Sequence, residues 1–321
     1  MDQTVAHYNI LERLGGGALG DVYRARDTRV GRTIALMMAP PDLVADPARR
    51  QQFLRDANAA RTLNHPNIAM LFDVVEQNGR CYLAYEFAAG PSLRQEMSGR
   101  AMPIRRAIEL AAQIADALAE GHAQGFVHGD LRPETVVVTP KGSTKILNFG
   151  MSSWTAGGSA RAKVAQGSKT LDPDEAQVAG YLSPEQALGG SIDARSDVFS
   201  LAVVVFEMLT GVNPFRGATT EQTVLNIIQA RPVAPSSKTA EVPPELDTLV
   251  TKMLAKEIDS RPSSAAALAA EFRSLGAALD VRSGDAAPAV LIPAEDERRS
   301  VGVWVVVAVA IAGAAAWWFL R

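Results

Sequence analysis

The feature that most constrains the fold is a change in hydrophobic periodicity at Gly90-Pro91. Before this dipeptide, short apolar runs alternate with polar residues and stop at glycine, proline or asparagine, a pattern typical of strands and turns. After it, apolar residues recur at helical spacing over residues 104–124, 196–209 and 244–254. The sequence therefore predicts an α+β chain in which a small strand-rich lobe precedes a larger helical lobe.

Composition excludes several other classes of protein. The chain has 321 residues, a net charge of -3, 47% hydrophobic and 21% charged residues, which are values of a globular chain rather than a disordered or fibrous one. Basic residues are outnumbered by acidic ones and do not gather in one segment, so no nucleic-acid partner is expected. The single cysteine, Cys81, excludes an internal disulfide and a zinc site built on cysteines, and no metal-ligating residues are predicted.

Residues 301–320 carry no charge and are long enough, as a helix of about 30 Å, to cross a bilayer. Tryptophan occurs near both ends of this stretch, and Arg298 and Arg299 precede it, which predicts that the preceding chain stays in the cytoplasm. A buried core helix is the alternative, although such a helix without a polar face is unusual. We expect a single-pass, C-terminal anchor in the cell membrane. Alanines spaced four apart would also permit self-association through this span: Ala308, Ala312 and Ala316.

Six short motifs between residues 8 and 275 occur in a fixed order. Gly15, Gly17 and Gly20, followed by Val22, fit the pattern G-x-G-x-x-G-x-V. The other five are His128-Gly129-Asp130, Asn148-Phe149-Gly150, Ser183-Pro184-Glu185, Asp197 and Arg261-Pro262. On these residues the chain resembles the eukaryotic-type serine/threonine protein kinase domain, and its alanine- and arginine-rich composition is similar to bacterial members.

The resemblance implies a two-lobed kinase-like domain over residues 8–275, a juxtamembrane linker over 276–300 and the transmembrane helix over 301–320. It also implies structural roles for five positions. Asp197 would be buried at a helix start and accept hydrogen bonds from the catalytic-loop backbone. Glu185 and Arg261 would form a buried ion pair, in which removal of one partner costs about 3–5 kcal/mol. His128 and Phe149 would stack in a column that links the lobes.

The residues that handle charge in this family are replaced. Phosphoryl transfer needs positive charge at the phosphates, a divalent metal and an acceptor for the hydroxyl proton. Met37 stands where the family has the phosphate-holding lysine, and the first lysine of the chain is Lys141. Asn148 and Thr135 stand at the two magnesium-binding positions. Because magnesium prefers carboxylate and phosphate oxygens, we do not expect it to bind strongly.

Three further positions depart from the family pattern. Asp56 replaces the glutamate that pairs with the lysine and is one methylene shorter. Gly129 replaces an arginine that contacts a phosphate on the activation segment in many relatives. Arg132 replaces a lysine; the arginine keeps the positive charge but changes its geometry. Asp130 remains at the position of the catalytic base.

The resemblance also implies a slot for the adenine of ATP. Val22, Ala35 and Val137 would form its apolar walls, and Tyr85 would be its gatekeeper residue. The hinge would contain Glu86 and Ala88. The glycines above the phosphates would be Gly15, Gly17 and Gly20. The same residues would pack equally well in an empty cleft, so ATP binding is left open.

Loss of one charge-stabilising group typically costs about 10²–10³ in rate, and several are replaced here. We therefore predict a membrane-anchored pseudokinase with lost or residual phosphotransfer. It would act as a regulatory or scaffolding module for a protein partner, either a kinase or a substrate of a signalling pathway. The activation segment, residues 151–182, is expected to be a loop with hydroxyl residues that another kinase could phosphorylate. The alternatives are an active serine/threonine kinase that uses Asp130 with Arg24 or Arg132 as a non-standard cation, and a nucleotide sensor without chemistry.

Overall fold

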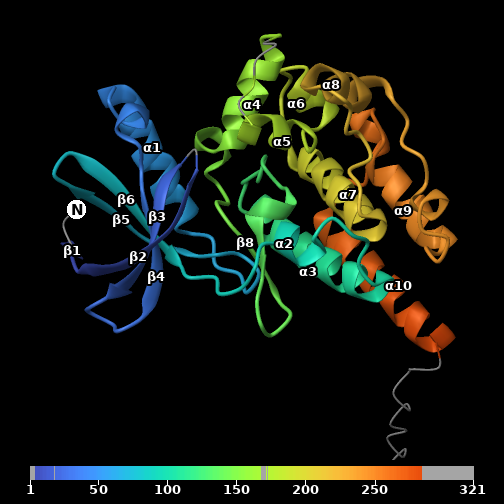
Figure 1. The fold of residues 1–321 in the computed structure, drawn as a ribbon, viewed down its shortest axis with the longest axis horizontal. Helices are drawn as coiled ribbons and strands as arrows, with labels where there is room; N and C mark the ends of the chain where they lie inside the picture. Colours follow the sequence, from blue (N-terminus) through green and yellow to red (C-terminus); the bar gives the residue numbers. More distant parts are fainter. Residues whose placement is uncertain (1–3, 18, 168–170, 172, 284–321) are drawn as a thin grey trace, which may run out of the picture. The chain divides into compact units, whose positions relative to one another are not determined.

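The computed structural model describes residues 4–17, 19–167, 171 and 173–283, and the described residues up to Leu279 belong to one compact unit. This unit has two lobes, which Figure 1 shows in blue to teal for the N-lobe and in teal through green to orange for the C-lobe. The elements of the N-lobe are β1 (Thr4–Val5), β2 (Tyr8–Gly17), β3 (Gly20–Asp27), β4 (Thr33–Met38), α1 (Pro47–Ala60), β5 (Leu71–Gln77) and β6 (Arg80–Glu86).

The N-lobe is a six-stranded antiparallel sheet in the order β1-β2-β3-β4-β6-β5, with α1 packed on one face (Figure 1). Helix α1 begins with Asp46 as its N-cap, whose carboxylate accepts from the amide of Arg49, and with proline in its first turn. Its buried side chains, Phe53, Ala57 and Ala60, share a core with Met37 of β4. The side chain of Met37 therefore belongs to the core between the sheet and α1.

The β2–β3 hairpin depends on Gly20. This residue has φ of +108°, and a Cβ there would lie 1.9 Å from the carbonyl oxygen of Met38. A residue with a side chain would clash with that backbone, so glycine is required for the hairpin to approach β4 this closely.

The C-lobe is mainly helical. Its elements are α2 (Leu93–Met97), α3 (Ile104–Ala123), β7 (Val136–Val138), β8 (Thr144–Ile146), α4 (Ala156–Ala165), α5 (Pro173–Ala179), α6 (Pro184–Ala187), α7 (Ala194–Thr210), α8 (Thr220–Gln229), α9 (Pro244–Met253) and α10 (Ala265–Ser283). Short 3-10 turns lie among them at Pro133–Thr135, Ser152–Trp154, Pro235–Ser237 and Ile258–Ser260, and one in the N-lobe at Pro41–Leu43.

Helix α7 forms the centre of the C-lobe core. It is buried from Ser196 to Leu209 and contacts α3 and α9. Asp193 caps its amino end, and Gly211, with φ of 77°, ends it in the left-handed conformation. The C-lobe core is therefore built around a helix that is fixed at both ends.

The two predicted lobes are confirmed, and the helices expected at 104–124, 196–209 and 244–254 correspond to α3, α7 and α9. Helix α10 continues to Ser283, past the predicted start of the linker at residue 276. Among the described residues no helix has the length and apolar character needed to cross a membrane. The predicted span at 301–320, with most of the linker, lies outside the described residues.

Candidate functional site

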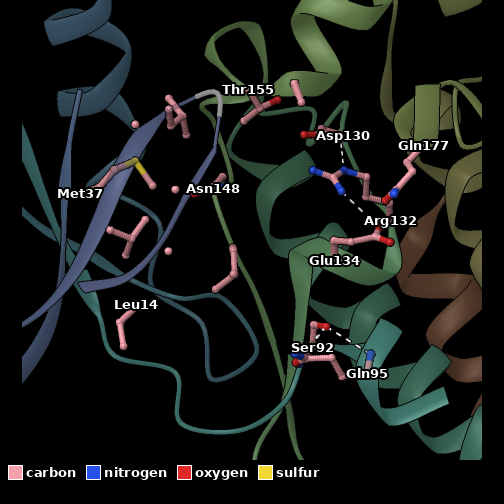
Figure 2. Close-up of a pocket in the computed structure, with 17 residues that line it drawn as sticks. Leu14, Met37, Ser92, Gln95, Asp130, Arg132, Glu134, Asn148, Thr155 and Gln177 are labelled. Carbon is pink, nitrogen blue, oxygen red and sulfur yellow. Dashed lines mark hydrogen bonds and ion pairs between the residues drawn. The ribbon is translucent and has the colours of Figure 1, made fainter. Parts of the chain in front are cut away.

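A cavity of about 590 Å³ lies between the β2–β3 loop and the catalytic loop, the segment from His128 to Thr135. Figure 2 shows Met37 and Asn148 on one side of it and Asp130, Arg132 and Glu134 on the other. A second cavity of about 210 Å³ adjoins it. The residues that line both are Leu14, Val22, Met37, Leu147 and Asn148. The two cavities are therefore parts of one cleft.

The smaller cavity, called the ring slot below, brings together the predicted adenine-slot residues. Val22, Ala35 and Val137 line it. So do Tyr85, whose pKa is raised by burial, and Ala88 of the hinge. Within the described part of the chain, the N–H and C=O of Ala88 have no hydrogen-bond partner. The slot is thus an apolar space with one unpaired backbone donor and acceptor at its edge.

The remaining slot positions divide between the two cavities. Glu86 lines the ring slot, but Nζ of Lys145 lies 2.7 Å from its carboxylate and offsets the charge. Gly15 and Gly20 line the larger cavity. Gly17 pairs with Gly20 at the end of the hairpin, as the last residue of β2.

Met37 occupies the lysine position with an apolar side chain. It lies in β4 opposite Val22 and Leu83, is 8% exposed and lines both cavities. Figure 2 shows its thioether at the cleft wall. Because a thioether carries no charge, this wall offers no cation to a phosphate.

Asp56 of α1 stands at the position that pairs with a lysine in the family, but here its side chain binds the activation segment. Its Oδ2 accepts a hydrogen bond of 2.8 Å from the indole N–H of Trp154. The Trp154 ring is buried and lies edge-on to Phe53, with 5.2 Å between ring centroids. No pattern in the sequence singled out Trp154, because it lies 98 positions from Asp56.

The activation segment is largely helical in its described residues and covers the catalytic-base position. Helix α4 lies beside Asp130, and a Cβ on Gly157 would lie only 2.4 Å from Cγ of that residue. The side chain of Asp130 is 2% exposed, and its Oδ2 has no protein partner among the residues that the structure describes. Glycine at 157 therefore permits α4 to pack directly on the Asp130 carboxylate.

Arg132 is held between two carboxylates. Its Nε lies 3.1 Å from Oδ1 of Asp130, and its NH1 lies 3.2 Å from Oε2 of Glu134, as Figure 2 shows. Burial opposes its charge, but Asp130 and Glu134 outweigh this effect and raise the pKa of the guanidinium. Burial likewise opposes ionisation of Glu134, but Arg94 at 2.7 Å and Arg132 lower the pKa of that carboxyl. The charge of Arg132 is thus already neutralised within the protein.

The two expected metal positions offer little to a cation. The hydroxyl of Thr135 lies 3.1 Å and 2.9 Å from the carbonyls of Asp130 and Arg132 and accepts from the Arg132 amide. It is buried and lines neither cavity. Asn148 does line the cleft, in a left-handed conformation (φ 61°) that asparagine tolerates. Its amide supplies an oxygen but no charge.

The shape-keeping contacts implied by the resemblance are present. Asp197 is fully buried, and its two carboxylate oxygens accept from the amides of His128 and Gly129, each at 2.8 Å. Glu185 and Arg261 form two hydrogen bonds of 2.8 Å. These bonds fix the catalytic loop and the end of the activation segment to the C-lobe core.

Gly129 and Phe149 are fixed by close packing. Gly129 has φ of +68°, and a Cβ there would lie 3.0 Å from Oγ of Ser152, so an arginine at this position would be strained. The ring of Phe149 is perpendicular to that of His128, with 5.1 Å between centroids. Phe149 belongs to the C-lobe core cluster.

Arg24, the other cation considered for the site, points to a different partner. Its Nε lies 3.0 Å from a carboxylate oxygen of Glu12, and its side chain is 42% exposed. It lines neither cavity of the cleft.

Comparison with known proteins agrees with this geometry. Residues 8–273 match the family described as the protein kinase domain, and the chain belongs to that family. More narrowly, it is similar to bacterial serine/threonine kinases. It is 38% identical to serine/threonine-protein kinase PknB of Mycolicibacterium smegmatis over 301 residues, 92% of this chain and 46% of that protein. Identity to the probable serine/threonine-protein kinase SCO3848 of Streptomyces coelicolor is 35% over 263 residues, 80% of this chain and 38% of that protein.

Both alignments cover less than half the length of those relatives. The crystal structure of the PknI kinase domain from Mycobacterium tuberculosis superposes with a TM-score of 0.66 at 24% identity, covering 84% of this chain and 96% of that one. At this identity the likeness shows the two-lobed kinase fold alone.

Proposed function

We propose that the chain is a membrane-anchored pseudokinase, a regulatory or scaffolding module whose phosphotransfer is lost or residual. One observation carries this proposal. Of the described residues that line the cleft, Arg132 is the sole cation, and Asp130 and Glu134 already share its charge.

The magnitude of the loss supports this reading. Phosphoryl transfer depends almost entirely on positioning and on charge stabilisation at the transferred group. Removal of one such group costs about 10²–10³ in rate, although such losses are not additive. Met37 stands at the position of a phosphate-holding lysine, and Asn148 stands at the position of a metal-binding carboxylate. Helix α4 also covers the base position, Asp130. With these losses, the rate of a kinase that normally turns over about 1–100 times per second would fall below a useful signalling rate.

The contacts that keep the kinase shape support a role in binding. Kinases act on proteins, so a protein surface is the expected partner, and we propose a kinase or a substrate of the same signalling pathway. Anchoring by residues 301–320 would raise the effective concentration of the module near such partners in the membrane.

An active kinase is the second candidate. Oδ2 of Asp130 has no described protein partner, which leaves it able to accept a proton, and the relatives above are named as kinases. This activity would require α4 to move away from Asp130 and Arg132 to be released from its carboxylates.

A phosphotransfer assay separates the two candidates. The full-length chain in detergent is incubated with radiolabelled ATP, magnesium or manganese, and a generic protein substrate, beside the isosteric control Asp130→Asn. We expect equal background label from both proteins. Label transfer that the control abolishes would show an active kinase and refute the proposal.

Membrane anchoring and partner binding are tested separately. Cell fractionation should find the full chain with membranes and a chain lacking residues 301–320 in the soluble fraction; the same distribution for both would refute the anchor. Pull-down from native membranes should recover a protein partner that an Asp197→Ala variant with a disturbed catalytic loop recovers less well.

A further inference from the structure

We propose that a groove between the start of α1 and one face of α4 binds a segment of a partner protein that is rich in carboxylate side chains. This inference rests on the proposed function, because it names the surface through which a regulatory module would bind its protein partner. It also links that binding to the position of α4 over Asp130.

The groove, called the α1–α4 groove below, encloses about 420 Å³ and meets the cleft at Thr155, which lines both. Leu43 and Arg49 line one side of it. The other side is a single face of α4 with its two caps, because the lining residues recur three and four positions apart: Thr155, Gly158, Ser159, Ala162, Lys163 and Gln166. At about 1.5 Å per residue this face is about 16 Å long, the length of about five residues of extended chain.

Arg49 is the cation of the α1–α4 groove whose charge is not already paired. Its guanidinium lies 5.7 Å from the centre of the Trp154 ring and donates to no residue that the structure describes. Lys163, the other cation of the lining, lies 2.7 Å from the carboxylate of Glu175, which offsets its charge. The described part of the lining contains no carboxylate. One positive charge is therefore left for a ligand.

Four acidic residues adjoin the lining and reduce the positive charge around it. Three of them already accept hydrogen bonds: Asp46 from the backbone N–H of Arg49, Asp56 from Trp154, and Glu175 from Ser159 and Lys163. The fourth, Asp42, is exposed beside Leu43, where water and salt screen its charge. A carboxylate of a ligand would therefore meet the guanidinium of Arg49 while the acids of the protein stay with their own donors.

The chemistry of the groove favours an acidic peptide. A guanidinium presents two parallel N–H donors that match the two oxygens of a carboxylate. The hydroxyl of Ser153 and the side-chain amide of Gln166 stand at opposite ends of the α4 face, and neither has a hydrogen-bond partner among the residues described. Both would bond the backbone of an extended peptide. Such a peptide uses the charge and the length of the groove, whereas a small free acid uses the charge alone.

Binding in the α1–α4 groove favours the state in which Asp130 is covered. Arg49 belongs to α1 and the facing residues belong to α4, so a ligand that contacts both binds only while α4 packs beside α1. A ligand that binds one arrangement and not another stabilises the arrangement that it binds. Because Gly157 of α4 lies against Asp130 in this arrangement, partner binding and an uncovered Asp130 oppose each other.

Fluorescence anisotropy with the full-length chain in detergent tests the inference with two fluorescein-labelled peptides. The acidic peptide carries aspartate or glutamate at three of five positions, and the neutral peptide carries asparagine or glutamine at the same positions. We expect the acidic peptide to bind at least ~5-fold more tightly, the effect of one exposed ion pair. Raising the salt concentration should reduce this preference.

Variants of exposed arginines locate the binding. Arg49→Gln should remove the preference for the acidic peptide, and Arg49→Lys should retain part of it, because lysine keeps the charge without the paired donors. The matched control is Arg231→Gln, a substitution of another exposed arginine that lies outside the groove lining and should leave the preference unchanged. Thermal unfolding checks that each variant folds. Hydrogen exchange of the α4 amides should slow when the acidic peptide binds the parent chain, but not when it is added to Arg49→Gln.

Four results would overturn the inference. They are equal binding of the two peptides, a preference that Arg49→Gln leaves unchanged, an equal loss in Arg231→Gln, and peptide binding without slower exchange in α4. Inorganic phosphate is titrated as well: saturable, Arg49-dependent phosphate binding without binding of the acidic peptide would make the groove a site for a small anion and would also overturn it. None of these results restores phosphotransfer. Phosphotransfer that depends on Asp130 overturns the pseudokinase proposal itself, whichever peptide binds.

Discussion

Replacing Trp154 by phenylalanine removes the indole N–H from Asp56 and leaves an aromatic ring beside Phe53. The lost bond is charge-assisted, a class worth about 1.5–3 kcal/mol when buried. Asp56 is only half-buried and also accepts from Gln52 at 2.6 Å, so we reduce the expected loss to about 1 kcal/mol. Trp154→Ala also removes the buried ring and should cost about 3–5 kcal/mol.

The contribution of the bond itself is measured by a double-mutant cycle. Urea unfolding of the parent chain, Trp154→Phe, Asp56→Ala and the double variant gives a coupling energy, which we expect to be about 1 kcal/mol. Hydrogen exchange should locate the effect, because the amides of α4 follow Trp154 directly and should exchange faster in Trp154→Phe. A coupling energy near zero, with α4 protected as before, would refute the view that this bond holds the activation segment to α1.

Four other predictions concern the C-lobe. Gly157→Ala puts a Cβ 2.4 Å from Cγ of Asp130, so α4 must shift; we expect a loss of about 1–3 kcal/mol in urea unfolding, and an unchanged midpoint would argue against the contact. Arg261→Met strands the carboxylate of Glu185 and should cost about 3–5 kcal/mol. Burial opposes ionisation of Glu185, but its bonds to Arg261 and Ser196 lower its pKa. The contribution of the Glu185 carboxylate to the free energy of unfolding is therefore present above its unfolded pKa of about 4.3. It is lost as the pH falls through the lower pKa of the folded state. Glu185→Gln has no carboxylate at this position and should lack this part of the acid-dependent loss. Burial and then Arg261 lower the pKa of Lys256 to about 8, so at this residue the unfolded chain binds more protons between about pH 8 and 10. The stability of the parent chain relative to Lys256→Met should therefore rise over that window.

The lobes could be predicted from the sequence because they depend on local patterns, whereas the ring slot was implied by the resemblance to the kinase family. Strand alternation and helical spacing set the elements, and the slot residues lie at fixed places within strands and the hinge. The buried bonds of Asp197 and the Glu185–Arg261 pair were implied by the same resemblance, because its motifs contain these residues.

The helical activation segment could not be predicted. Helix α4 contains two glycines and no strong apolar stripe, so its sequence alone does not indicate a helix. It is stabilised by packing of Ala156 and Ala160 against Val178 and Leu182, and by a tryptophan bound to a distant helix. The internal bonds of Thr135 were also hidden, because residue type alone does not show where a hydroxyl points.

The packing of Gly157 on Asp130 has a consequence for any attempt to give this cleft phosphotransfer activity. Met37→Lys or Asn148→Asp would add charge to the cleft, but neither substitution would uncover the carboxylate of Asp130. Under the proposed function, gain of activity would therefore require changes in both lobes and in the segment between them.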